Sequence, residues 1–89
     1  MTISHDKFKA ILDEDYGYDD KLVGDYVLRG LKIIEGYLPN KTLIEGADHD
    51  ILYSVDIEDL IDAGITEGDV VMLGKFGWHV SDDYLAHFV

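Results

Sequence analysis

The sequence predicts an α+β domain in which N-terminal helices pack on a strand–helix–helix–hairpin unit with a small antiparallel sheet. Three observations predict this class. Apolar residues recur at helical spacing in the first part of the chain, they alternate as in a strand near residues 51–55, and two short helical patterns then precede a C-terminal hairpin pattern. A chain of 89 residues has room for one hydrophobic core, so residues 1–89 are expected to form a single compact domain.

The N-terminal part contains two helical patterns. Apolar residues at helical spacing over 6–12 predict a short helix that ends near Glu14. A longer apolar stripe over 20–35 predicts a second helix, which Gly36 and the following Pro39 bring to an end. The sequence therefore begins with two amphipathic helices joined by a turn.

Two glycines interrupt the second helical pattern. Gly24 and Gly30 each cost a helix interior about 1 kcal/mol relative to Ala. They are six residues apart and do not share a face, which argues against a motif for helix dimerisation. Close packing against a neighbouring element is the expected reason for them.

The second part begins with a strand. Ile51, Tyr53 and Val55 alternate on one face, and two short helices are expected over 57–63 and 67–75. The tail from Trp78 is expected to form two strands around a turn at Asp82–Asp83, which gives a sheet of three strands in all. A two-residue turn would place Val80 opposite Leu85 and Trp78 opposite His87, whereas a longer loop would shift that register.

The predicted core combines the apolar faces of all these elements. Its members are Phe8, Ile11, Leu22, Tyr26, Leu31, Ile34, Ile57, Leu60, Ile61, Leu73, Trp78 and Val80.

The order of elements over residues 50–89 resembles a winged helix-turn-helix unit. The second short helix and the hairpin take the places of the recognition helix and the wing. A winged helix that recognises DNA carries Arg and Lys on these elements. Here the segment offers only Lys75, so we expect the winged-helix order without the DNA-binding role.

The composition is strongly acidic. Nineteen Asp and Glu residues against seven Lys and Arg residues give a formal net charge of −12. Residues 45–89 hold eleven of the acids and only one base. This charge excludes a protein that binds nucleic acid by broad phosphate neutralisation, and it disfavours docking to an anionic membrane surface. We therefore expect neither nucleic acid nor a membrane as a partner.

The acidic half predicts a surface for a basic partner. Carboxylates one helical turn apart lie about 5–6 Å from each other, which is comparable to the spacing of phosphates along a nucleic-acid strand. Tyrosines are enriched at protein interfaces, and some of those that adjoin acidic residues are candidates for the same surface. The predicted partner-binding residues are Glu58, Asp59, Asp62, Glu67, Asp69, Asp82, Asp83, Tyr84, Tyr16 and Tyr18.

In size and acidity the chain is similar to small phage-encoded anti-CRISPR and anti-restriction proteins and to acidic immunity proteins of nuclease toxins. The similarity is compositional. It implies an inhibitor that binds the basic nucleic-acid-binding surface of a nuclease or of a CRISPR or restriction effector, with nucleic-acid mimicry as one mode of binding. A second hypothesis is a regulatory or assembly module that binds another protein through Tyr residues and the hairpin, while the acids serve solubility. A homodimer is a further alternative.

Catalytic signatures are absent from the sequence, although a small hydrolase remains a third hypothesis. The four histidines are scattered, and Asp48-His49-Asp50 is interpreted as a solvated turn. The nine glycines form no phosphate-binding loop. We expect no enzyme activity, no metal and no cofactor. The chain has no cysteine, no signal-peptide pattern and no long apolar run, so a cytoplasmic location is expected, in the host if the gene belongs to a phage.

Overall fold

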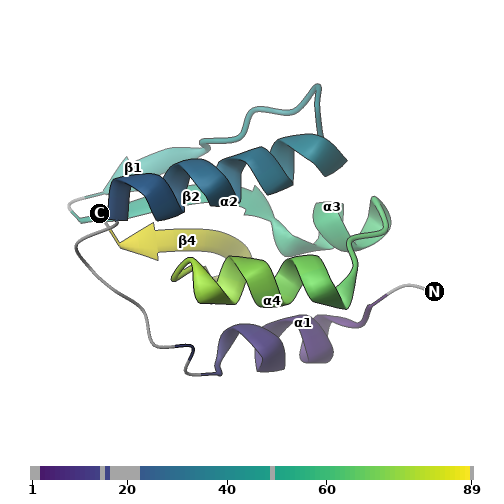
Figure 1. Ribbon diagram of the computed structural model, residues 1–89. Coiled ribbons are helices and arrows are strands. Elements are labelled where there is room, and N and C mark those ends of the chain that lie inside the picture. The colour runs from purple at the N-terminus through teal and green to yellow at the C-terminus, as the bar shows by residue number, and fades with distance from the viewer. Residues whose placement is uncertain (1–2, 15, 17–22, 49, 89) are drawn as a thin grey trace.

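The computed structural model describes residues 3–14, 16, 23–48 and 50–88 (Figure 1). The helices are α1 (His5–Leu12), α2 (Val23–Tyr37), α3 (Ile57–Asp62) and α4 (Glu67–Lys75). The strands are β1 (Gly46–Asp48), β2 (Ile51–Asp56), β3 (His79–Ser81) and β4 (Tyr84–Phe88). Helices together with one small antiparallel sheet confirm the α+β class.

The predicted helices and the strand at β2 occur close to their expected bounds. Residues 20–22 of the second predicted helix lie outside the described residues. The predicted number of strands was wrong, because β1 adds a fourth strand to the expected three. This strand has the sequence Gly-Ala-Asp, which is too short for an alternating pattern and has low strand propensity, so only pairing with β2 defines it.

The strands follow the order β1-β2-β4-β3, and all neighbours are antiparallel. The strand before the two short helices therefore pairs with the last strand of the hairpin. The register shifts by one residue between Tyr53 and Asp56, so that β2 contains a bulge there. Ser54 and Val55 are both buried as a result, and the Ser54 hydroxyl donates to the Leu43 carbonyl.

The C-terminal hairpin adopts the two-residue turn. Val80 pairs with Leu85, and Asp82 and Asp83 have φ values of 50° and 67°. Positive φ at both central residues is typical of the turn that matches the twist of paired strands, and Asp tolerates it better than most residues. The rings of Trp78 and His87 lie edge to face with their centroids 5.2 Å apart. This agrees with the prediction that a two-residue turn places these two residues opposite each other.

Three helices begin at side-chain caps. The Ser4 hydroxyl accepts from the Lys7 backbone N–H, and the Asp56 carboxylate accepts from that of Glu58 at 2.8 Å. Thr66 caps α4 in the same way through the N–H of Asp69. Each cap satisfies a backbone donor that the first helical turn leaves without a partner.

The core lies where the helices meet one side of the sheet. Eight predicted members are buried, namely Phe8, Ile11, Ile34, Ile57, Leu60, Ile61, Leu73 and Trp78. Tyr26, Leu31 and Val80 are half-buried, and Leu22 lies outside the described residues. The core also includes Ile3, Leu12, Val55, Ile65, Val70 and Leu85, which the prediction omitted.

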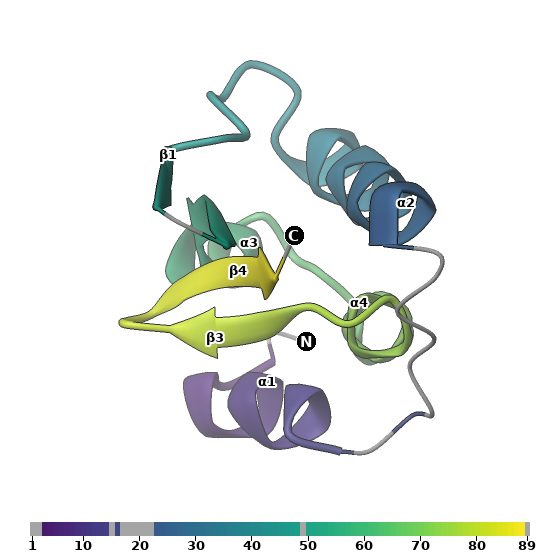
Figure 2. The ribbon, with the colours of Figure 1, turned by 90° about the vertical axis from the view of Figure 1, so that its left-hand side faces the viewer.

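The helices pack on one side of the sheet. Helix α1 contacts α3, α4 and β3, while α2 contacts α4 and α3 contacts β2. In Figure 2, β3 and β4 lie nearer the viewer than α3, and no described helix lies in front of them. The other face of the sheet is therefore not covered by any described helix.

Candidate functional site

The predicted acidic side chains lie at three places in the fold. These are helix α3, the first turn of α4, and the turn between β3 and β4. Helix α3 carries Glu58, Asp59 and Asp62, and the first turn of α4 carries Glu67 and Asp69. The β3–β4 turn consists of Asp82 and Asp83.

Backbone contacts bring the β3–β4 turn against the start of α3. The N–H of Ile57 donates to the Asp83 carbonyl at 3.0 Å, and Tyr84 is the strand partner of Asp56. The first turn of α3 and the hairpin turn are therefore neighbours, although about twenty-five residues of sequence separate them. This arrangement could not be inferred from spacing along the chain, because a strand pairing creates it.

Lysines from the first half of the chain pair with three of the predicted carboxylates. Lys7 pairs with Glu67 at 3.7 Å, Lys9 with Asp83 at 2.9 Å and Lys41 with Asp59 at 2.9 Å. Each pair is exposed and each joins the two halves of the sequence, so the charge separation along the chain is partly cancelled in space. These three carboxylates already have a cation beside them.

The pKa values follow from these pairs. The hydrogen bond and charge of Lys9 lower the pKa of Asp83, and the same contact raises the pKa of Lys9. Asp59 raises the pKa of Lys41 in the same way. Within the described part of the chain, the predicted carboxylates without an ion pair are Glu58, Asp62, Asp69 and Asp82.

Asp69 has a structural contact. The Tyr37 hydroxyl donates to the Asp69 carboxylate, and it accepts from the Thr66 N–H at 3.3 Å. One hydroxyl thus ties the end of α2 to the start of α4. This leaves Glu58, Asp62 and Asp82 as the predicted carboxylates that are exposed and unpaired among the described residues.

The predicted tyrosines differ in their surroundings. The ring of Tyr16 packs against Gly74, and its hydroxyl donates to the Ile11 carbonyl at 2.8 Å, so this side chain belongs to the edge of the core. Burial raises the pKa of Tyr16, with a further contribution from Glu14. Tyr18 lies outside the described residues, whereas the side chain of Tyr84 is 39% exposed. Tyr84 remains the accessible candidate.

Aromatic residues gather on the face of the sheet opposite the core. Tyr53 and His79 are the two strand partners of Ala86, so the three side chains share one face. Phe88, two residues along β4, is on the same face, and its ring stacks on that of His79 at 4.7 Å. We call this surface the open sheet face; its members are Ile51, Tyr53, His79, Tyr84, Ala86 and Phe88. This face as a whole was not predicted, although the alternation of Tyr84, Ala86 and Phe88 along β4 was a signal for it.

A groove crosses one end of the open sheet face. Its cavity volume is about 430 Å³, and it is lined by Glu45, Gly46, Tyr53, Ser81, Asp82 and Tyr84. These residues come from β1 or its border, β2, β3, the β3–β4 turn and β4. The lining residues include two tyrosines and two acidic residues. Strand β1, which was not predicted, completes the groove because Gly46 belongs to it and Glu45 precedes it.

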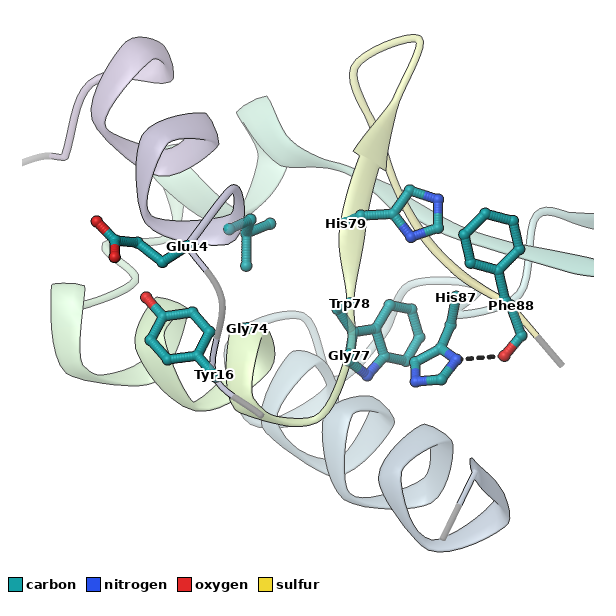
Figure 3. Close-up of a pocket in the computed structure, with 9 residues that line it drawn as sticks. Glu14, Tyr16, Gly74, Gly77, Trp78, His79, His87 and Phe88 are labelled. Carbon is teal, nitrogen blue, oxygen red and sulfur yellow. Dashed lines mark hydrogen bonds between the residues drawn. The ribbon is translucent and has the colours of Figure 1, made fainter. Parts of the chain in front are cut away.

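A second pocket lies where α1, α4 and the hairpin meet (Figure 3). Its cavity volume is about 260 Å³, and aromatic rings of Tyr16, Trp78, His79, His87 and Phe88 line it. His87 is 1% exposed, and its Nδ1 and Nε2 lie 2.6 and 2.7 Å from the carbonyls of Phe88 and Phe76. Both ring nitrogens thus face backbone oxygens, which leaves neither available as a catalytic base.

The second histidine that lines this pocket is His79. Partial burial lowers its pKa, and the neighbouring His87 lowers it further.

Among the described residues, no group of three or more His, Asp or Glu side chains is arranged to hold a metal ion. The helices that the structure describes are too short or too polar to cross a membrane.

Comparison of the chain with protein-family models, with curated proteins and with solved structures found no match. The function proposed below therefore depends on the geometry of this chain.

Proposed function

We propose that this chain is a small acidic inhibitor that covers the basic, nucleic-acid-binding surface of a nuclease or of a CRISPR or restriction effector. The observation that carries the proposal is the contact between Ile57 and Asp83. This contact holds the β3–β4 turn against the start of α3. Glu58 of α3 and Asp82 of the turn therefore belong to neighbouring elements.

The charge supports a basic partner. Three ion pairs leave the net charge of −12 unchanged, because each pair contains one charge of either sign. Like charges on one surface destabilise the fold by a few tenths of a kcal/mol per close pair. The same charges attract a cationic surface over a Debye length of about 10 Å and accelerate encounter with it.

The experiment compares two variants with the same change in net charge. Glu58→Lys with Asp62→Lys reverses the unpaired carboxylates of α3, and Glu14→Lys with Glu35→Lys reverses two exposed carboxylates of the first half. We expect the wild type and the second variant to capture basic nucleic-acid-binding proteins from a lysate and to inhibit the captured enzyme. The α3 variant should lose both properties.

The salt dependence of binding is the second measurement. Binding through charged groups weakens steeply as the salt concentration rises, because the attraction is screened. Full inhibition by the α3 variant would contradict the proposal. Binding that is insensitive to salt would do the same.

A second candidate function is a binding module whose contacts are mainly apolar. The exposed fractions of Phe88 and Tyr84, 59% and 39%, favour it, since both lie on the open sheet face. In that case Phe88→Ser should abolish partner binding, whereas the α3 reversal should leave it nearly intact.

A further inference from the structure

We propose that the groove on the open sheet face seats an arginine side chain of the partner. This inference rests on the proposed function, because it specifies how a basic partner is recognised. The lining residues of the groove include two tyrosines and two acids, namely Tyr53, Tyr84, Glu45 and Asp82.

The strand register places these residues together. Tyr53 is in β2 and Tyr84 is in the neighbouring strand β4, so the two rings project from the same sheet. The backbone N–H of Glu45 donates to the Tyr53 carbonyl at 2.9 Å, which fixes the approach to β1 beside β2. Asp82 is held at the opposite end by the hairpin turn. The groove is therefore built on paired strands and a tight turn.

The chemistry of this lining matches a guanidinium group. Arginine is planar, stacks on aromatic rings and forms paired hydrogen bonds with carboxylates, whereas the lysine ammonium is compact and more strongly hydrated. Two phenol rings and two carboxylates provide both kinds of contact. The exposed carboxylates Glu45 and Asp82 form no ion pair within the described part of the chain.

Among the described residues, Lys41 is a cation whose charge acts on the groove. Its charge interacts with Glu45 and Tyr84, but its Nζ lies 2.9 Å from the Asp59 carboxylate, which offsets that charge. The groove therefore keeps a negative balance. Charge complementarity selects a basic protein segment as the occupant and disfavours a nucleic acid, whose phosphates the same carboxylates repel.

The test measures binding of the full chain to an oligoarginine peptide and to an oligolysine peptide of equal length and charge. We expect oligoarginine to bind about tenfold more tightly, the range that one desolvated cation–π contact provides. The double substitution Tyr53→Ala and Tyr84→Ala leaves the net charge unchanged and should abolish this preference. Tyr53→Phe with Tyr84→Phe keeps the rings and should retain it.

A matched pair of variants tests the carboxylates. Glu45→Gln with Asp82→Asn should weaken oligoarginine binding more than Glu58→Gln with Asp62→Asn, although both remove two negative charges. Asn is tolerated at the positive φ of Asp82, so the turn should persist. Circular dichroism and urea unfolding establish that each variant is folded.

The outcomes separate this inference from the proposed function. Equal binding of the two peptides, or a preference that survives in the folded Ala double variant, would overturn the arginine seat while leaving a basic partner possible. Tighter binding of single-stranded RNA than of oligoarginine would also overturn it. A clear arginine preference together with failure of the lysate experiment would support the seat and contradict the inhibitor function.

Discussion

Gly30 of α2 lies directly against the indole ring of Trp78, so closely that a Cβ atom at this position would overlap the ring. The indole Nε1–H donates to the Tyr26 carbonyl, one helical turn before Gly30, at 3.3 Å. A glycine therefore lets Trp78 pack on the backbone of α2. The packing of Trp78 explains why a glycine, which is unfavourable in a helix interior, occupies position 30. The close packing that was expected at the glycines of this helix is thus confirmed for Gly30.

Substitution of the two glycines of α2 by alanine should have opposite effects. Gly30→Ala should lower the free energy of unfolding by roughly 1–3 kcal/mol, because overpacking displaces Trp78. At Gly24 a Cβ atom would meet nothing within 4 Å, so Gly24→Ala should raise stability by up to about 1 kcal/mol through helix propensity. Urea unfolding followed by tryptophan fluorescence measures both. Destabilisation of equal size by the two substitutions would contradict this account of Gly30.

Tyr37→Phe should destabilise the contact between α2 and α4. The substitution removes the hydroxyl that donates to Asp69 and accepts from the Thr66 N–H. A hydrogen bond to a charged group contributes about 1.5–3 kcal/mol, and we expect a loss in that range. Tyr84→Phe is the control, since no hydrogen bond of its hydroxyl is found among the described residues. Chemical denaturation at neutral pH gives both values, and equal stability of the two variants would argue against the role of Tyr37.

Lys9→Met should raise the pKa of Asp83 towards its ordinary value. The hydrogen bond and charge of Lys9 lower that pKa in the folded protein, so the pair contributes stability at neutral pH that is lost as the pH falls through the folded-state pKa. The wild type should therefore lose more stability on acidification than the variant does. Carboxyl NMR titration measures the pKa directly, with Lys32→Met as a control that removes an exposed lysine of α2. An unchanged Asp83 titration in Lys9→Met would show that the pair is not formed in solution.

His79 should titrate below the ordinary pKa of histidine, which is about 6.5. Partial burial disfavours its charged form, and the charge of His87 adds to this effect. The unfolded chain then takes up a proton at a higher pH than the folded chain, so this histidine reduces stability as the pH falls through about 6.5. The reduction is complete below the folded-state pKa. NMR titration of the imidazole checks the direction, and His79→Gln should flatten this part of the stability profile. A pKa at or above the ordinary value would refute the prediction.

The sequence by itself determined the helices at α1, α3 and α4, the strand β2 and the position of the hairpin turn, whereas the two-residue length of that turn came from the structure. These elements follow from local signals, which are the apolar spacing and the Asp82–Asp83 pair. Local signals act between residues a few positions apart, and the chain order preserves them. The strong excess of acidic residues is likewise a property of the sequence alone.

Only the tertiary structure decided which charges and rings lie together on the surface. Lys9 and Lys41 come from the half with more bases, but strand and helix packing places them beside Asp83 and Asp59. Tyr53 belongs to the open sheet face because the strand register pairs it with Ala86, which is also the partner of His79. The physical reason is that ion pairs and grooves depend on contacts between residues far apart in sequence. Such contacts arise from packing and strand register, which a linear pattern of residue types does not contain.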